Sequence, residues 1–140
     1  MFLLDTNVVS ELRKIQSGKA HPSLVAWNEA VNPAELFLSV IVLHELEMGV
    51  RKIERLDRAA GKILRGWLEE SVMPAFSGRI LALDEAAAIQ AAEWHIPNPK
   101  TINDAYIAAT AYVRRMTIVT RNVRDFSGMD VTILNPWEDS

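Results

Sequence analysis

The sequence predicts an α/β fold in which a short, mostly parallel sheet carries helices on both faces. Short apolar runs alternate with stretches of helical periodicity along the whole chain, as is typical of strand–helix–strand units. Acidic residues follow several of these runs closely, as expected where parallel strands end at a common edge. With 140 residues, 49 % hydrophobic and 24 % charged, the chain has the size and composition of one globular domain. We therefore expect a single domain over residues 1–140.

The N-terminal elements follow from local signals. Residues 2–4 predict a strand, and Thr6 or Asn7 is expected to cap a helix that runs to about Arg13. The segment Ser17-Gly18-Lys19 then breaks the helical pattern.

A second helix, a second strand and a third helix are expected next. The second helix opens at Pro22-Ser23 and ends at Asn32-Pro33. The strand covers residues 35–38. Ser39 precedes the third helix, which carries Glu45 and is expected to stop near Gly49.

The middle of the chain predicts one long amphipathic helix that Pro74 ends. Apolar side chains recur there at helical spacing with charges between them, at Ile53, Leu56, Ala60, Ile63, Leu64, Trp67 and Leu68. Together with the helix that carries Trp27, it could line a groove for a partner helix.

The C-terminal half predicts three strands and two helices. The strands are expected at residues 79–83, 117–120 and 131–134. Asp84 is expected to cap one helix. The other helix follows Asn103 and is apolar nearly all round, so it should be buried against the sheet.

Four carboxylates stand where the expected strands end and the following segments begin. They are Asp5, Glu45, Asp104 and Asp125. Acids gathered at one edge of a sheet repel each other unless a hard cation holds them together. The pattern therefore predicts a Mg²⁺ or Mn²⁺ site, in which one or two ions activate a water for attack on a phosphodiester.

Each acid also has an ordinary explanation. Asp5 is a favoured helix cap, and Asp104 would be stabilised by a helix dipole, although Asn103 could already cap that helix. Glu45 could be an exposed surface residue and Asp125 a turn former. The four together carry more weight than any one of them. Four polar neighbours are expected to support the site by hydrogen bonds: Thr6, Asn7, Thr120 and Asn122.

The net charge of −3 argues against a protein that binds nucleic acid through overall positive charge. It does not exclude a nuclease, because several acids would bind the metal. Two stretches are locally basic, and either could equally be a solvated helix face. They comprise Arg51, Lys52, Arg55, Arg58, Lys62 and Arg65, and then Arg114, Arg115, Arg121 and Arg124.

Other kinds of site find little support. The chain has no cysteine, which excludes disulfides, thiolate zinc sites and a cysteine nucleophile. His21, His44 and His95 have no partner at metal-ligand spacing. An acid at position 5 leaves no room for a signal peptide, and no apolar run is long enough to span a membrane. We therefore expect a cytoplasmic protein.

Four segments in order carry a family resemblance: Leu3-Leu4-Asp5-Thr6-Asn7, Glu45-Leu46-Glu47-Met48-Gly49, residues 103–111 and residues 119–126. They resemble the PIN-domain ribonucleases and, more closely, the VapC-type toxins of bacterial toxin–antitoxin pairs, including the FitB-like branch. The resemblance implies a PIN-like three-layer sandwich and a Mg²⁺- or Mn²⁺-dependent endoribonuclease that acts on structured RNA such as tRNA.

The same resemblance implies site residues and partners. It carries over Asp5, Glu45 and Asp104 as the acidic site, with Asn122 or Asp125 at a fourth position. It also implies a homodimer and a cognate, VapB-like antitoxin that binds DNA.

Three other classes remain as alternatives. A receiver-like signalling domain would need an acidic pair early in the chain and a late lysine, whereas Asp5 has no acidic neighbour and the last lysine is Lys100. A haloacid-dehalogenase-type phosphatase would need an acid where this chain has Asn7. A non-catalytic binding module on the same fold stays open.

Overall fold

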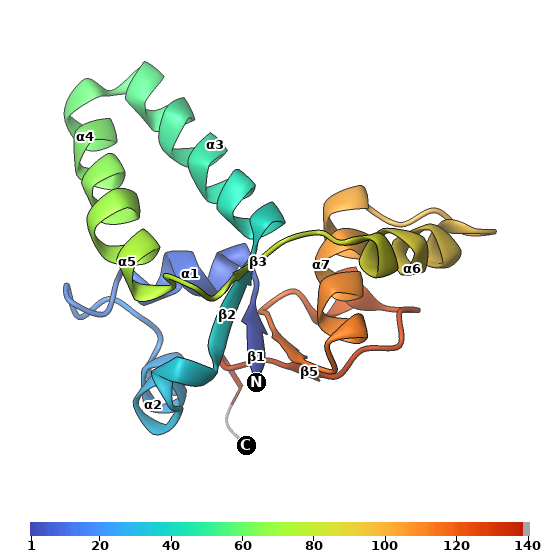
Figure 1. Cartoon of the computed structure of the whole chain (residues 1–140). Coiled ribbons are helices and arrows are strands. Elements are labelled where there is room, and N and C mark those ends of the chain that lie inside the picture. Colours follow the sequence, from blue (N-terminus) through green and yellow to red (C-terminus); the bar gives the residue numbers. More distant parts are fainter. Residues whose placement is uncertain (139–140) are drawn as a thin grey trace.

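The computed structural model describes residues 1–138 and contains a five-stranded sheet in the order β3-β2-β1-β4-β5 (Figure 1). All four strand pairs are parallel, so the predicted α/β class is confirmed. The central strands are largely apolar because both faces of the sheet are covered. The strands are β1 (Phe2–Leu4), β2 (Leu36–Ser39), β3 (Ile80–Leu81), β4 (Thr117–Val119) and β5 (Ile133–Leu134).

Helices cover both faces of this sheet. Helices α1 (Thr6–Leu12) and α2 (Pro22–Ala30) lie on one side, while α6 (Glu85–His95) and α7 (Ile102–Val113) lie on the other (Figure 1). Most of α7 is buried, because its many alanines let it approach the sheet closely. Among the described residues, no helix is long and apolar enough to cross a membrane.

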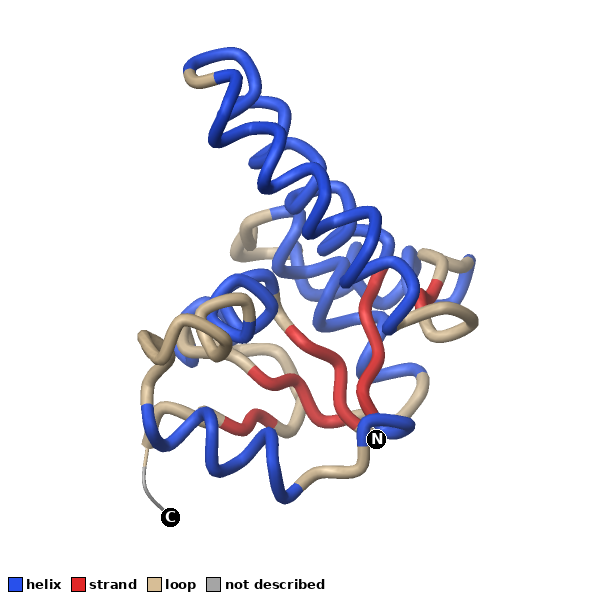
Figure 2. The backbone as a smooth tube through the Cα atoms, turned by 90° about the vertical axis from the view of Figure 1, so that its left-hand side faces the viewer, coloured by secondary structure: helices blue, strands red, loops and turns tan. Residues whose placement is uncertain are grey.

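Two helices form a hairpin that projects beyond the rest of the molecule (Figure 2). They are α3 (Val40–Leu56) and α4 (Arg58–Trp67), and α4 continues through a π-helical turn (Leu68–Val72) into α5 (Met73–Ala75). The two helices cross closely at Gly61, where a Cβ atom would lie only 2.4 Å from Cα of Glu54. This mutual packing supports the part of the hairpin that projects away from the sheet.

The observed bounds of the two hairpin helices show that two predictions from the sequence are wrong. The helix that carries Glu45 does not stop near Gly49 but runs on to Leu56. The single helix expected from Ile53 is instead divided at Asp57, whose carboxylate accepts a hydrogen bond from the backbone N–H of Ala60 at 3.1 Å and so caps α4.

Smaller differences concern the ends of elements. Strand β2 lies one residue later than expected, and β3, β4 and β5 are shorter than the predicted ranges of residues 79–83, 117–120 and 131–134. Strand β3 is short because it pairs only with Leu38 and Ser39. Asp5, not Thr6 or Asn7, caps α1, and Thr101 precedes α7, so Asn103 lies inside that helix. Asp84 caps α6 as predicted.

The order of the strands creates a switch point between β1 and β4. From β1 the chain moves outward through β2 and β3, and it then returns to add β4 and β5 on the other side of β1. Leu4 and Val119 are paired at the carboxyl ends of the two strands. Sites in open parallel sheets form at such a point, outside the carboxyl ends of the strands.

Candidate metal centre

Asp5 lies at the switch point, directly after β1, and only 6 % of its surface is exposed. Its backbone N–H bonds the carbonyl of Val119 at 2.9 Å, which ties it to the end of β4. Its Oδ1 accepts a hydrogen bond from the backbone N–H of Thr6 at 2.8 Å. Its Oδ2 accepts hydrogen bonds from the Thr120 hydroxyl at 2.8 Å and the Asn7 amide at 3.3 Å. The structure therefore brings Thr6, Asn7 and Thr120 to Asp5, as the sequence predicted.

Glu45 belongs to the first turns of α3 and lies beside the same strand ends. Its Oε1 accepts a hydrogen bond from the Thr6 hydroxyl at 2.6 Å, and its Oε2 accepts one from the amide of Asn103 at 3.3 Å. Thr6 thus joins the two acids by donating its backbone N–H to Asp5 and its hydroxyl to Glu45. The sequence analysis assigned Asn103 to a helix cap and missed this contact, because Glu45 is 58 residues away in the chain.

Asp104 lies in the first turn of α7, half-buried beside the other acids. Burial, together with the negative charges of Asp125, Asp5 and Glu45, raises the pKa of Asp104 to about 6. Among the residues that the structure describes, no hydrogen-bond donor or cation is paired with its carboxylate. A partly buried carboxylate without a donor is destabilised by the negative charges of nearby acids unless a cation neutralises them.

The pKa of Asp5 is also raised, chiefly because the carboxyl is buried. The hydrogen bonds from Thr120 and Thr6 oppose this rise, while the charges of Glu45 and Asp125 add to it. The charges of Glu45 and Asp125 therefore act on both Asp5 and Asp104 at this edge of the sheet.

Asp125 and Asn122 follow β4 at the exposed rim of the site. Asp125 lies in a short 3-10 helix, Val123–Phe126, and its charge reaches both Asp5 and Asp104. Asn122 donates its backbone N–H to the hydroxyl of Thr120 at 3.0 Å. Asp125 thus brings a negative charge near Asp5 and Asp104, and Asn122 contacts Thr120.

Within residues 1–138, no group of three or more Asp, Glu or His side chains is arranged to hold a metal ion as the side chains stand. Hydroxyl and amide donors hold the oxygens of Asp5 and Glu45 instead. The chemistry of the donor set nevertheless fits a hard divalent cation, since all four acids offer carboxylate oxygens.

Comparison with known proteins identifies the family. The model of the PIN domain matches residues 2–131, which is most of the chain. The chain belongs to the PIN-domain family. The resemblance stated from the sequence is thereby confirmed, and with it the PIN-like three-layer arrangement of helices and sheet.

Two relatives of this PIN-domain protein match over nearly the whole chain. The toxin FitB of Neisseria gonorrhoeae is 38 % identical, and the match covers 99 % of this chain and 100 % of FitB. The VapC ribonuclease Y4jK of Sinorhizobium fredii is 35 % identical and covers 99 % of both chains.

Solved structures share the fold. The crystal structure of FitAcB from Neisseria gonorrhoeae contains a chain that superposes with a TM-score of 0.86 at 36 % identity, covering 98 % of this chain and 99 % of that one. VapBC-5 from Mycobacterium tuberculosis, a member of the VapBC family of toxin–antitoxin systems, superposes with a TM-score of 0.63 at 26 % identity, covering 95 % and 96 %.

Proposed function

We propose that this PIN-domain protein is the toxin of a toxin–antitoxin pair and an endoribonuclease that requires Mg²⁺ or Mn²⁺. Its substrate is structured RNA such as tRNA, in which it hydrolyses phosphodiester bonds. The observation that carries the proposal is Asp104, a half-buried acid with a raised pKa that lies among three other acids at the switch point of the sheet. The names of the toxin and ribonuclease relatives support it.

Asp5, Glu45, Asp104 and Asp125 would hold the metal. Bound there, the ion would supply an activated water and would neutralise the charge that develops on the phosphodiester. Carboxylate oxygens favour Mg²⁺ and Mn²⁺ over softer metals. Asp5 and Asp104 are the best candidates for direct ligands, since both lie where regular elements begin, and Glu45 would be a ligand or would orient the water.

The polar neighbours fix where these acids lie. Thr120 and Asn7 direct Oδ2 of Asp5, and Thr6 and Asn103 direct the two oxygens of Glu45. Asn7 is itself fixed because its Oδ1 accepts the backbone N–H of Arg121 at 3.1 Å. These donors therefore hold the carboxylates of Asp5 and Glu45 at the strand ends, and the four acids would still move closer together to bind an ion.

The test is cleavage of tRNA by wild type, Asp5→Asn and Asp104→Asn, each with Mg²⁺, with Mn²⁺ and with EDTA. Both substitutions keep the shape and remove one charge, so we expect cleavage to fall at least about 100-fold while the fold persists in thermal melts. Glu29→Gln on the exposed surface of α2 is the matched control and should cleave like wild type. DNA should be a poor substrate.

Two results would contradict the proposal of a metal-dependent nuclease. One is full cleavage by wild type in EDTA, and the other is full activity of a folded Asp5→Asn protein. A binding module would instead hold RNA or a protein partner and cleave nothing under any of these conditions.

A groove on the α1–α4 side is our proposed contact for the antitoxin. It has a volume of about 490 Å³, and apolar side chains line much of it, among them Val9, Leu12, Ile63, Trp67 and Phe76. Arg13 lies 5.8 Å from the ring centroid of Trp67 and adds positive charge at the groove. An amphipathic helix of a VapB-like, DNA-binding antitoxin fits these features, since such helices lay an apolar face into a groove.

The sequence predicted that the helix carrying Trp27 would also line this groove. Trp27 does not line the groove but packs edge-to-face on Phe2.

We also propose that the protein is a homodimer of single-domain chains over residues 1–140 and acts in the cytoplasm, where its RNA substrate is found. Residues 139–140 of that range lie outside the described part of the chain.

A further inference from the structure

A second cavity lies beside the groove on the α1–α4 side. It has a volume of about 470 Å³, and three of its five lining residues are cations. This basic pocket is lined by Arg13, Lys14, Gln16, Ser17 and Lys19. Among residues 1–138 no acid lines it, although the net charge of the whole chain is −3. A hollow surface with several cations and no acid favours an anionic ligand.

The turn after α1 gives the basic pocket its shape. Gly18 has a φ of +71°, a left-handed conformation that glycine adopts at little cost, and its N–H bonds the carbonyl of Ile15 at 3.0 Å. The carbonyl of Lys14 accepts the backbone N–H of Lys19 at 3.1 Å and the hydroxyl of Ser17 at 3.0 Å. The chain therefore turns back on itself and brings two lysines to the same cavity.

Two of the three cations in the basic pocket have no acidic partner. Lys14 lies 3.1 Å from Glu11, which neutralises part of its charge. Arg13 and Lys19 have no carboxylate within 4.0 Å in the described part of the chain. The guanidinium of Arg13 lies over the ring of Trp67, a contact that orients it without using its N–H donors.

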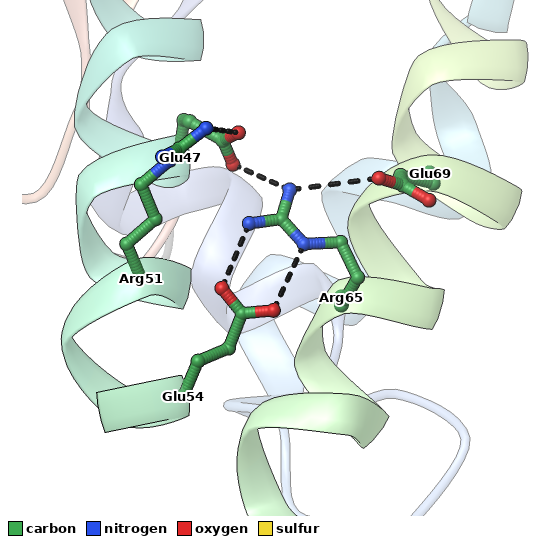
Figure 3. Close-up of polar contacts among 5 residues, drawn as sticks. All are labelled: Glu47, Arg51, Glu54, Arg65 and Glu69. Carbon is green, nitrogen blue, oxygen red and sulfur yellow. Dashed lines mark hydrogen bonds and ion pairs between the residues drawn. The ribbon is translucent and has the colours of Figure 1, made fainter. Parts of the chain in front are cut away.

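Other arginines of this region already have partners. Arg65 holds α4 against α3, because it lies 2.6 Å from Glu47 and binds Glu54 through two nitrogens at 2.9 and 3.2 Å (Figure 3). Arg79 lines the groove and donates a hydrogen bond to the carbonyl of Pro33 at 2.9 Å. The positive charge that remains for a ligand beside the groove is therefore in the basic pocket.

The basic pocket is continuous with the apolar groove. Arg13 and Gln16 line both cavities. Asp5, at the metal centre, caps the opposite end of α1, about 12 Å away along the helix axis. RNA phosphates in the pocket would leave the adjoining apolar wall without a suitable contact, whereas a peptide helix with an apolar face and acidic side chains would match both cavities.

We propose that the partner helix in the groove ends in acidic side chains, which bind Arg13 and Lys19 in the basic pocket. The inference rests on the proposed antitoxin contact and adds the charge and the direction of the segment that makes it. An amphipathic helix can lie in an apolar groove in either direction, but only one direction brings an acidic end to these cations. The carboxylates would also form charge-assisted hydrogen bonds with the guanidinium and ammonium groups.

The test is the rate at which the purified product of the adjacent gene associates with the toxin at low and high salt. Stopped-flow tryptophan fluorescence can follow it, because Trp67 lines the groove. Charge pairs at the edge of an interface act chiefly on the association rate and its salt dependence. Lys19→Glu should therefore lower this rate about tenfold at low salt and flatten its dependence on salt.

Two further variants serve as controls for charge and position. Lys19→Arg keeps the charge and should associate like wild type. Lys52→Glu makes the same charge change at an exposed lysine of α3 that lines neither cavity, so the rate should change less than about twofold. An equal loss in Lys19→Glu and Lys52→Glu would mean that net charge, and not the basic pocket, attracts the partner, and would overturn the inference.

A charge swap identifies the acids of the partner. Acidic residues at the two ends of its helix are replaced by lysine, one at a time. A replacement at the correct end should slow association with wild type and restore the rate with Lys19→Glu, because the pair is rebuilt with opposite charges. If no replacement at either end restores the rate, the acids do not bind in the basic pocket.

The outcomes separate this inference from the function on which it rests. If Ile63→Asp weakens antitoxin binding but Lys19→Glu associates like wild type, the groove contact stands and the inference fails alone. If Lys19→Glu instead weakens only the binding of tRNA in EDTA, the basic pocket holds phosphates and the inference is overturned. If wild type does not bind the product of the adjacent gene, the antitoxin contact and the inference fall together. If tRNA is not cleaved but association follows the expected pattern, the nuclease proposal falls and the inference is supported.

Discussion

The two carboxylate oxygens of Asp5 have different roles. Oδ1 caps α1 through the backbone N–H of Thr6, while Oδ2 is held by Thr120 and Asn7 at the site. The two explanations that the sequence left open for this residue are therefore compatible. Asparagine caps helices about as well as aspartate, so Asp5→Asn removes the charge with little loss of the cap. An alanine substitution would remove both and could not separate stability from activity.

The site could be predicted from the sequence to the extent that it depends on strand ends. Asp5 and Thr120 follow β1 and β4, and Asp104 opens an apolar helix, so their positions follow from local patterns. The contact from Asn103 to Glu45 depends on how α7 packs against α3, and no local signal reports that packing. The sequence led us to expect repulsion between the acids, whereas burial is the larger cause of the raised pKa of both Asp5 and Asp104.

Asp104 makes the stability of the metal-free protein depend on pH. Its pKa is about 6 in the folded protein, above the ordinary value of 3.8, so the folded state binds more protons than the unfolded state between about pH 4 and 6. The free energy of unfolding should therefore fall as the pH rises through this window. Asp104→Asn should flatten that fall and, at pH 7, stabilise the metal-free protein by about 1 kcal/mol after allowance for partial exposure.

Urea unfolding in EDTA at several pH values measures this effect, with Glu29→Gln as the control. A wild type and an Asp104→Asn variant with the same pH profile would contradict it. Adding Mg²⁺ should raise the stability of wild type at pH 7 more than that of the variant, since a bound ion stabilises only the state that holds it.

At the scale of elements, the helices on the sheet followed from local patterns, but the hairpin did not. Apolar residues recur at helical spacing across Asp57 without interruption, so periodicity alone predicts one helix there. The break depends on the capping geometry of Asp57 and on the close crossing of α3 and α4. Strand ends were misplaced for a related reason, because the length of a short strand is set by its partner, as for β3.

The two glycines of the hairpin give opposite predictions for the same substitution. Gly49→Ala should stabilise the protein by about 0.5–1 kcal/mol, because alanine favours the helix and nothing lies within 4 Å of its Cβ. Gly61→Ala should destabilise it by about 1–3 kcal/mol, because the new Cβ would lie 2.4 Å from Cα of Glu54. Thermal or urea unfolding of the two variants measures the contrast. Equal effects would mean that α3 and α4 do not cross closely at Gly61.

At the scale of the whole molecule, the parallel order of the strands explains why distant residues meet. The switch point brings the ends of β1 and β4 together, so Asp5 and Thr120 touch across 115 residues of sequence. The apolar groove on the α1–α4 side is lined by none of the four acids. Binding of a partner helix in the groove could therefore be tested without changing any of the four acids.

Ile63 provides that test, because it lines the groove and is 69 % exposed. Ile63→Asp places a charge where the antitoxin helix would bury apolar surface, so we expect the affinity to fall about 30-fold or more. Ile89→Asp makes the same change at a residue of α6 that is 71 % exposed, away from the groove, and should leave the complex intact.

The experiment is to co-express each variant with the product of the adjacent gene and to measure the molecular mass of the purified complex. The mass reports both the antitoxin contact and the toxin dimer. Antitoxin binding by Ile63→Asp at wild-type strength would place the partner elsewhere, and a monomeric free toxin would contradict the homodimer.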